Sequence, residues 1–555
     1  MDVSDLPRLV RNTGRFHEVV AVAMKYGIAP WLGGVRAEWV QRHLRTSDGQ
    51  QISELPHEVR VRMALTELGT TFIKLGQILS TRADLVGPEL ADELARLQSN
   101  TPADSPESVV RLVTAEFEAA PDTVFREFDP VAFASASIGQ VHHAILKNGT
   151  AVVVKVQHEG IEERVQNDLE ILIQLAGLAE TYSTELAQYR PLATAREFSK
   201  TLRDELNFTR EQHNLTRFAH NFKDDPRISI PAPHLECCSE RVLTMDQLHG
   251  ISLNDREALV ASGYDLSDIA RRGAKMFLDM VFRDGFYHAD PHPGNLMVVE
   301  DAAIGLLDCG MVGRVDEDLR EQIEDLLMAA IDRDSKRLLD SVVELGEVPP
   351  DFDRAQLQIE LVEFIENFGT QSIDNFDLSG ALNGMTDIIR QHHILLPSRV
   401  SLLVKMLVML EGTAQQLSPD FNIVELLEPY RVESIKRRLS PQRAWKKLQS
   451  AQRDWSRLAE TFPADVTDIM TRIRRGSFNI NLEHRKLDNI VNRMVLGILT
   501  AALFVGSASL WSNNVKPLIR DTSVPGGLGC LAAVYLGFTL IRAIKKSGDI
   551  YGPDK

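Results

Sequence analysis

The stretch His288-Ala289-Asp290-Pro291-His292-Pro293-Gly294-Asn295 decides the fold class of this chain of 555 residues. Asn295 follows Asp290 by five residues, and thirteen residues later Asp308 opens Asp308-Cys309-Gly310. Carboxylate and amide oxygens are the ligands that Mg²⁺ prefers in proteins. This order and spacing predict a site in which one acid orients a reacting group, while the amide and the second acid hold a metal ion.

Protein kinases arrange the same groups as H-R-D-x-x-x-x-N followed by D-F-G. By that comparison Asp290 orients the attacking group, and Asn295 and Asp308 hold Mg²⁺ against the phosphates of ATP. An alternative is an H-x-D-x-H metal site made by His288 and His292. That site would need further ligands, and none is obviously placed in the sequence. The five-residue step from Asp290 to Asn295 favours the kinase interpretation.

Lys155 is the one charged residue in the run Ala151-Val152-Val153-Val154-Lys155-Val156, which predicts a buried strand. A buried ammonium group is costly unless it is paired. In a kinase-like site Lys155 would hold the α- and β-phosphates and form an ion pair with a carboxylate on a helix. A surface lysine on an edge strand is the alternative.

A small-residue loop precedes that strand, where kinases have the glycine-rich loop that covers the phosphates. Gly139 is its one glycine, so alanines are expected to stiffen the loop and change how it covers a nucleotide. The alternative is a plain turn between strands. The predicted nucleotide-binding loop consists of Ala134, Ser135, Ala136, Ser137, Ile138, Gly139 and Gln140.

The carboxylate partner of Lys155 is expected in a helix predicted over residues 194–222. Glu205 and Glu211 are the candidates, and their separation by six residues would point them to different sides of one helix. One would pair with Lys155 and the other would serve a different contact. The sequence does not decide between them.

Composition excludes some functions. The net charge of −17 argues against a nucleic-acid partner, which needs a basic face. Four scattered cysteines make neither a disulfide framework nor a C-x-x-C zinc site. The N-terminus lacks the basic and apolar regions of a signal peptide. These features are typical of a protein from a reducing compartment.

The C-terminal quarter differs from the rest. Residues 431–493 hold fifteen basic and seven acidic side chains, which suits an anionic membrane surface, although a solvated basic helix pair is the alternative. Residues 494–511 and 522–541 then carry no charge. Each approaches the roughly 20 residues that cross a bilayer. Basic residues on both outer flanks predict a hairpin with its ends in the cytoplasm. A buried core hairpin is the alternative.

Together these motifs resemble the UbiB family of atypical kinases, the aarF-domain-containing proteins of ubiquinone biosynthesis. The resemblance covers about residues 65–330. Its matching pieces are Lys74-Leu75-Gly76-Gln77 (the family's K-x-G-Q), the loop Ala134 to Gln140, Lys155, the helix Glu205 to Asn214, His288 to Asn295 and Asp308-Cys309-Gly310.

The resemblance implies a K-x-G-Q helix packed over the place where a protein kinase binds its peptide. Lys74 would point toward the nucleotide pocket and Gln77 would help fix that helix. The family is credited with ATPase activity that supports ubiquinone production. One departure concerns Asn207, which stands where the family usually has an acid, so a charge-based hold on Lys74 from that position is not expected.

The sequence thus predicts an α+β, protein-kinase-like two-lobed fold with an N-terminal helical extension and a C-terminal transmembrane helical hairpin. The domains expected are a K-x-G-Q extension (1–120), a kinase-like domain (121–415, with lobes about 121–245 and 246–415), a basic membrane-proximal segment (416–493) and transmembrane helices at 494–511 and 522–541.

The expected function is that of a membrane-anchored ATPase that binds ATP and Mg²⁺ and supports the biosynthesis of ubiquinone or a related isoprenoid lipid. Its expected partners are ATP, membrane lipids, isoprenoid or quinone precursors and enzymes of ubiquinone biosynthesis. Its expected place is a bacterial inner membrane, with the kinase-like domain in the cytoplasm. The alternatives are a true kinase with a protein or small-molecule acceptor, and a nucleotide-gated, non-catalytic lipid scaffold.

Overall fold

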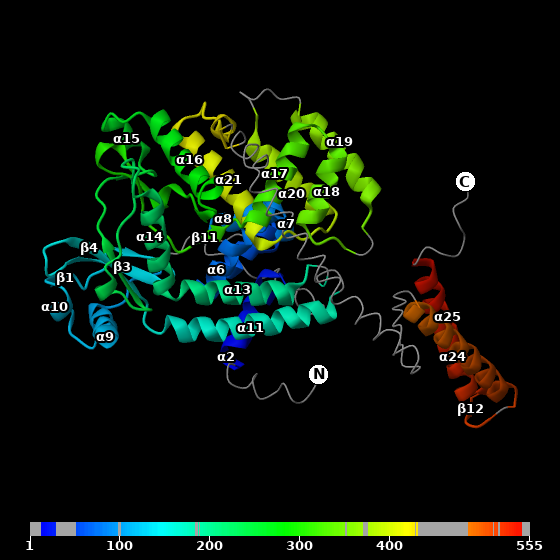
Figure 1. The fold of residues 1–555 in the computed structure, drawn as a ribbon. Coiled ribbons are helices and arrows are strands. Elements are labelled where there is room, and N and C mark those ends of the chain that lie inside the picture. The colour runs from blue at the N-terminus through cyan, green and yellow to red at the C-terminus, as the bar shows by residue number, and fades with distance from the viewer. Residues whose placement is uncertain are drawn as a thin grey trace, which may run out of the picture. The chain divides into compact units, whose positions relative to one another are not determined.

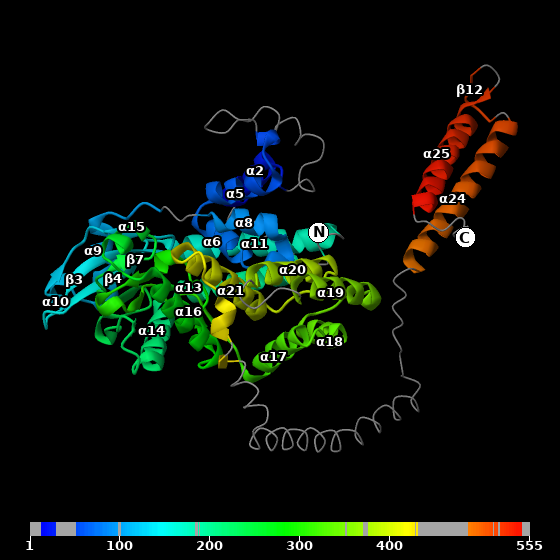
Figure 2. The ribbon, with the colours of Figure 1, turned by 90° about the horizontal axis from the view of Figure 1, so that it is seen from above.

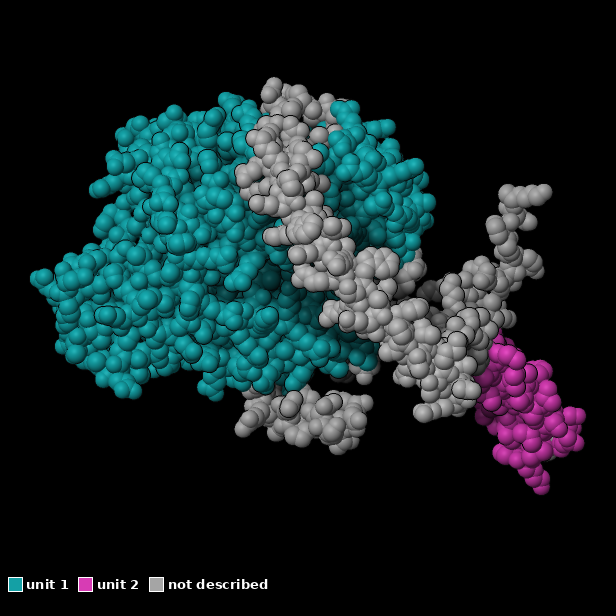
Figure 3. All heavy atoms as spheres, viewed as in Figure 1, with its two compact units in different colours: residues 1–440 teal, residues 441–555 magenta. Residues whose placement is uncertain are grey.

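A computed structural model describes residues 13–28, 52–97, 101–183, 187, 189–349, 352–369, 376–427, 429–430, 487–513, 515–519 and 522–546. The chain divides into two units, residues 1–440 and residues 441–555, which Figure 3 colours separately. The predicted mixture of helices and sheets is confirmed. Most of the predicted basic segment, residues 431–486, lies outside the described residues.

The first unit begins with a group of helices around the K-x-G-Q motif (Figures 1 and 2). Gly76 lets helix α6 pack closely, because a Cβ atom there would overlap Leu97 and come within 2.9 Å of Leu65 Cδ1. The elements are α2 (Thr13–Tyr26), the 3-10 helix η3 (Ile52–Glu54), α5 (His57–Leu68), α6 (Thr70–Leu79), α7 (Ala83–Val86) and α8 (Pro88–Ala95).

A five-stranded antiparallel sheet follows, with strand order β1-β3-β4-β6 and β2 paired to β3. Val152, Val154 and Val156 of β4 are buried against helix α9, so Lys155 faces the opposite side of the sheet. The predicted buried strand with one lysine is therefore confirmed. The elements are α9 (Pro106–Phe117), α10 (Pro121–Val124), β1 (Glu127–Phe128), β2 (Ala134–Ser135), β3 (Gly139–Ile145), β4 (Ala151–Gln157) and β6 (Val242–Asp246).

The α-helices that the structure describes between β4 and β6 in the sequence are α11 (Ile161–Tyr182), α13 (Pro191–Glu205) and α14 (Phe208–Phe222). Helices α11 and α13 lie side by side (Figure 1). The single helix predicted over 194–222 is wrong, because it breaks at Leu206-Asn207. Asn207 has an extended backbone, and its side chain accepts a hydrogen bond from the Thr209 amide at 2.9 Å, which caps the start of α14.

The motif-bearing part of the chain follows helix α16, whose apolar face is buried in the main core. Strands β9 and β10 form an antiparallel pair flanked by β5 and β7, while β8 pairs with β11. The elements are β5 (Ile228–Ser229), η4 (Leu235–Cys237), β7 (Ile251–Ser252), α15 (Arg256–Ala261), α16 (Leu266–Phe282), β8 (Phe286–His288), η5 (Pro293–Asn295), β9 (Leu296–Val298), η6 (Glu300–Ala302), β10 (Ile304–Leu306) and β11 (Val312–Arg314).

Among the described residues, the first unit continues with the helices α17 (Glu317–Ile331), α18 (Ser335–Leu345), α19 (Arg354–Gly369), α20 (Leu378–Gln391) and α21 (Ser398–Leu417). Arg82 and Asp84 of the N-terminal helices form a buried ion pair of 2.9 Å, and both side chains bond to residues at the start of α21 or just before it. The same guanidinium donates to the Leu396 carbonyl at 3.1 Å, and Ser401 donates to Asp84 at 3.2 Å.

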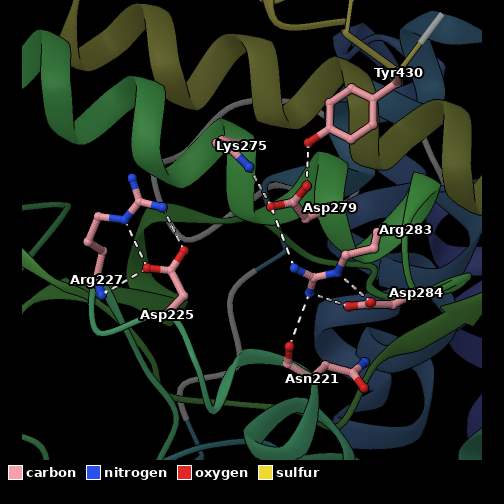
Figure 4. Close-up of polar contacts among 8 residues, drawn as sticks. All are labelled: Asn221, Asp225, Arg227, Lys275, Asp279, Arg283, Asp284 and Tyr430. Carbon is pink, nitrogen blue, oxygen red and sulfur yellow. Dashed lines mark hydrogen bonds and ion pairs between the residues drawn. The ribbon is translucent and has the colours of Figure 1, made fainter. Parts of the chain in front are cut away.

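Polar contacts hold the end of α16 (Figure 4). Asp279 accepts hydrogen bonds from Lys275 at 2.7 Å and from the Tyr430 hydroxyl at 2.5 Å. Arg283 forms an ion pair with Asp284 at 2.7 Å and donates to the Asn221 carbonyl at 3.2 Å. These contacts fix the helix that leads directly into β8 and the Asp290 loop.

The second unit contains α24 (Leu487–Ser512), β12 (Leu518–Ile519), β13 (Thr522–Ser523) and α25 (Val524–Lys546). Within the described residues, Met494–Ser512 is the helix long and apolar enough to cross a membrane, and Val524–Leu540 is a shorter apolar helix. The segment predicted to be helical from residue 522 therefore becomes helical at Val524. Gly529 lies against Ser507 in the contact between α24 and α25.

Candidate functional site

The Asp290 loop and the Asp308 loop meet because β9 and β10 connect them as a tight antiparallel pair. Asn295 precedes β9 and Leu307 follows β10, and the Leu307 amide donates to the Asn295 carbonyl at 2.9 Å. The side chain of Asn295 donates to the carboxylate of Asp290 at 2.9 Å. Two predicted site residues, five positions apart in sequence, are thus in direct contact.

His288 joins these two loops through both of its ring nitrogens. Its Nδ1 accepts a hydrogen bond from the Asp290 amide at 3.2 Å, so its Nε2 carries the proton and donates to the Asp308 carbonyl. Burial lowers the pKa of His288, which favours this neutral form.

The H-x-D-x-H metal alternative receives no support from this arrangement. Backbone groups engage both ring nitrogens of His288, and Nδ1 of His292 accepts from the Gly294 amide at 3.0 Å. Among the described residues no group of three or more histidine, cysteine, aspartate or glutamate side chains is placed to hold a metal ion.

Lys155 lies between two carboxylates. Its Nζ is 2.8 Å from Glu211 and 3.5 Å from Asp308, and it sits 5.1 Å from the centre of the Phe208 ring. Glu211 on α14 is therefore the ion-pair partner that the sequence left undecided. Burial would lower the pKa of Lys155, but the carboxylates of Asp308 and Glu211 raise it, so the ammonium is charged.

The Asp308 carboxylate is ionised, and its side chain is partly exposed to solvent. Burial tends to raise the pKa of Asp308, yet the Lys155 charge and a hydrogen bond from the Gly310 amide at 2.7 Å hold it well below its usual range. The Asp308 side chain is 48% exposed, unlike that of Glu211 at 5%. Helix α14 also holds the adjoining Cys309 peptide in place, because the side-chain amide of Asn214 donates a hydrogen bond to the Cys309 carbonyl at 2.9 Å.

These groups fit a magnesium ion by their donor chemistry. Asn295 uses its amide nitrogen on Asp290, which leaves its amide oxygen as a ligand. Asp308 presents a half-exposed carboxylate on the neighbouring loop. An amide oxygen and a carboxylate, with further positions left for phosphate and water, suit the octahedral preference of Mg²⁺.

Lys74 of helix α6 reaches the same cluster. Its Nζ forms an ion pair of 2.9 Å with Glu205, the last residue of α13. Burial would lower the pKa of Lys74, but Glu205 and Asp308 raise it. Glu205 thus serves the second contact, while Asn207 is occupied as the cap of α14. Gln77 donates to the Leu97 carbonyl at 3.1 Å and so ties α6 to the end of the N-terminal helices.

The small-residue loop forms a tight turn between β2 and β3, because the Ala136 amide donates to the Gly139 carbonyl at 2.8 Å. A Cβ atom at Gly139 would lie 2.7 Å from the Val156 carbonyl oxygen, so a glycine is needed there. His158 braces the loop by contacting the Ala136 carbonyl at 2.9 Å. Gln140 is fully buried and accepts from the Asp104 amide at 2.8 Å.

Lys405 is a charged residue near the site that the sequence analysis missed. It lies on α21 in the run Leu402-Leu403-Val404-Lys405-Met406-Leu407, and its Nζ donates to Ser80 Oγ at the end of α6 at 2.8 Å. A lone lysine in an apolar run was the signal that singled out Lys155, and the same signal would have found this residue.

Three family models match the chain. The ABC1 atypical kinase-like domain matches residues 96–342, the UbiB helical domain matches residues 361–422, and the ABC1/UbiB kinase-like C-terminal domain matches residues 479–546. A "Probable protein kinase UbiB" from Azotobacter vinelandii is 32% identical over 82% of this chain and 84% of its own length. The chain belongs to the UbiB family of atypical kinases.

Another relative of the chain is the "Uncharacterized protein in hydrogenase 1 5'region" of Clostridium pasteurianum, which is 31% identical over 88% of this chain and 93% of its own length. Among solved structures, the complex of Rv3197 with erythromycin from Mycobacterium tuberculosis aligns with 74% of this chain and 97% of its own, with 21% identity and a TM-score of 0.46.

Proposed function

We propose that this UbiB-family protein is a membrane-anchored ATPase that binds Mg-ATP and supports the biosynthesis of ubiquinone or a related isoprenoid lipid. The observation that carries the proposal is the placement of Lys155 between Glu211 and Asp308. An ammonium held by a helix carboxylate next to a second, half-exposed carboxylate is the arrangement with which kinases bind the phosphates and metal of ATP.

The proposed organisation follows the sequence prediction. The five-stranded sheet with its helices forms one lobe and the motif-bearing part with α17–α21 forms the other, with ATP bound between them. Helices α24 and α25 form the membrane hairpin. Two features support that hairpin: apolar side chains such as Leu499 and Leu531 are at least 60% exposed, and the small residues Ser507 and Gly529 meet where the helices touch.

Each residue has a defined part in the proposed mechanism. Lys155 binds α- and β-phosphate oxygens, and Glu211 holds Lys155 in place. Asn295 and Asp308 hold the metal, which when bound neutralises charge on the phosphates. Asp290 orients the attacking water or acceptor. Its hydrogen bond from Asn295 holds its carboxylate next to the proposed metal site. The residues thus act by positioning and electrostatics.

Helix α6 favours hydrolysis over protein phosphorylation. It brings Lys74 and Glu205 into the cluster as a buried pair, beside the groups proposed to act on ATP. The end of this helix is also hydrogen bonded to α21 through Ser80 and Lys405. A helix fastened on both sides of the site leaves less room for a peptide than an open groove would.

The test is ATP turnover by the full chain in liposomes, with and without a quinone-precursor mimic, beside Lys155→Ala and Asp308→Asn variants. We expect Mg-dependent phosphate release that lipid and mimic increase, and that both variants lose. Normal turnover in Asp308→Asn would overturn the assignment. Tight nucleotide binding without turnover would favour the nucleotide-gated scaffold, and transfer of phosphate to the mimic or to a protein would favour a true kinase.

A further inference from the structure

Lys405 is a partly buried cation that the proposed mechanism does not use. It donates to Ser80 Oγ, and that hydroxyl donates onward to the Gln77 carbonyl at 2.6 Å. Among the described residues, no carboxylate lies within 4.0 Å of its ammonium group, unlike those of Lys155 and Lys74. Lys405 therefore carries a positive charge that no close anion neutralises.

Helix α21, which carries Lys405, packs on the Asp290 loop. Two turns further along α21, the Thr413 hydroxyl donates to the Pro291 carbonyl at 3.1 Å, so the helix packs directly on that loop. Burial lowers the pKa of Lys405 to about 8, and the nearby Asp290 carboxylate partly offsets this effect. An ammonium group that is partly withdrawn from water without a close counter-ion destabilises the folded protein, and such costs are typical of functional sites.

Phosphoryl transfer supplies an anion for such a charge. The transferred group spreads negative charge over its three equatorial oxygens, and an added cation stabilises that state. Lys155 and Lys74 already have carboxylate partners at 2.8 Å and 2.9 Å. We propose that Lys405 binds the oxygen atoms of the transferred phosphoryl group, beside Asp290. This inference rests on the proposed Mg-ATP chemistry.

The atoms balance with Lys405 protonated throughout. The bond between the terminal phosphorus and its bridging oxygen breaks, and that oxygen leaves with ADP. A new bond forms from phosphorus to the oxygen of water, whose proton passes to Asp290 and then to solvent. Lys405 contributes charge and hydrogen bonds to the moving group and takes no part in proton transfer.

The experiment measures binding of Mg-ADP with and without aluminium fluoride, which mimics the transferred group, to the full chain in detergent or nanodiscs. The variants are Lys405→Met and Lys405→Arg. Lys336→Met is the matched control, because Lys336 is an exposed lysine on helix α18 with no side-chain partner among the described contacts.

We expect Lys405→Met to weaken the aluminium fluoride complex by about 100-fold, below the 10³–10⁵ effect of a full arginine finger. Its affinity for Mg-ADP alone should stay within about twofold, since ADP lacks the transferred group. Lys405→Arg should recover part of the loss, and Lys336→Met should match the wild type. In single-turnover hydrolysis without an added acceptor, Lys405→Met should be slowed most, Lys405→Arg less, and Lys336→Met not at all.

Several results would overturn the inference. Unchanged binding of the fluoride complex in Lys405→Met would do so, and so would an equal loss for ADP alone, which indicates a structural role. A defect seen only when an acceptor is added would assign Lys405 to the acceptor. If Lys405→Met fails to fold, Lys405→Arg provides the test. An unchanged ratio of its affinities for Mg-ADP with and without aluminium fluoride would then overturn the inference. A wild type that binds no Mg-nucleotide would refute the proposed function and this inference together.

Discussion

At the scale of single residues, the site consists of three lysines and four carboxylates with distinct partners. Lys155 is paired with Glu211 and Lys74 with Glu205, while Lys405 has only a hydroxyl partner in the described contacts. The two glutamates sit on different helices, so each lysine is held by its own element. Removing one glutamate should therefore affect one lysine.

Glu211→Gln should lower kcat/KM for ATP by about 100-fold or more, because breaking a buried pair costs roughly 3–5 kcal/mol and leaves Lys155 misplaced. Steady-state turnover with Mg-ATP checks this. Glu205→Gln is the matched control, since it leaves the contact of Lys155 with Glu211 intact. Equal losses in the two variants would show that the lysines do not act separately.

Turnover should fall as pH rises through about 8, because the pKa of Lys405 is lowered to about 8 by burial and the ammonium is charged only below it. The Asp290 carboxylate is the charged group that raises the pKa of Lys405, and the Ser80 hydroxyl is the neutral group that accepts its hydrogen bond. Lys405→Arg should extend activity to higher pH, because a guanidinium stays protonated. A pH profile unchanged in that variant would assign the fall to another group.

The sequence predicted which residues would meet but not which would pair. Motif order and spacing were enough for Asp290, Asn295, Asp308 and Lys155. The partner of Lys155 could not be chosen, because the answer depends on a helix break at Leu206-Asn207 that propensity alone does not reveal. Lys405 comes from a helix distant in sequence, so only tertiary packing brings it to Ser80 and brings its helix onto the Asp290 loop.

At the scale of elements, helix α14 is the support of the site. Its start is capped by Asn207, its first turns carry Glu211, and Asn214 holds the peptide of Cys309. The break before α14 frees Glu205 to serve α6 instead. The position where the family usually has an acid is thus occupied here by a neutral cap.

Asn207→Ala should lower the free energy of unfolding by about 1 kcal/mol, since it leaves the Thr209 amide at the start of α14 without its side-chain acceptor. Thermal unfolding of the full chain, followed by circular dichroism, measures the shift. Asn207→Asp should keep wild-type stability, because a carboxylate caps equally well and suits the helix N-terminus. A large loss in the Asp variant would mean that negative charge is not tolerated beside this cluster.

At the scale of the whole molecule, the chain joins a kinase-like unit to a second unit whose described helices, α24 and α25, expose apolar side chains. Leu499, Val505 and Leu528 are each at least 60% exposed, although leucine and valine are ordinarily buried in proteins that fold in water. The charge-free runs predicted the two helices that the structure describes in this unit. What the sequence could not predict is the short pair of strands that delays the start of α25 to Val524.

Leu499→Lys should release the protein from membranes, because a lysine at the centre of a spanning helix costs about 2.5–3.5 kcal/mol on insertion scales. Carbonate extraction of vesicles, followed by quantitative blotting of both fractions, measures the release. Leu499→Phe should remain in the membrane fraction. Full retention of the lysine variant would show that this helix is not the anchor.

The hydrogen bonds of His288 have a consequence for inhibitor chemistry. The His288 imidazole hydrogen bonds to both the Asp290 loop and the Asp308 loop. If either loop moved away, a buried ring nitrogen would lose its hydrogen bond. A compound that must displace the Asp308 loop would have to break the hydrogen bond between His288 and the Asp308 carbonyl. Compounds that fit the loop in its present position, and compete with the proposed nucleotide for the Lys155 side of the site, are the more promising starting point for a selective probe.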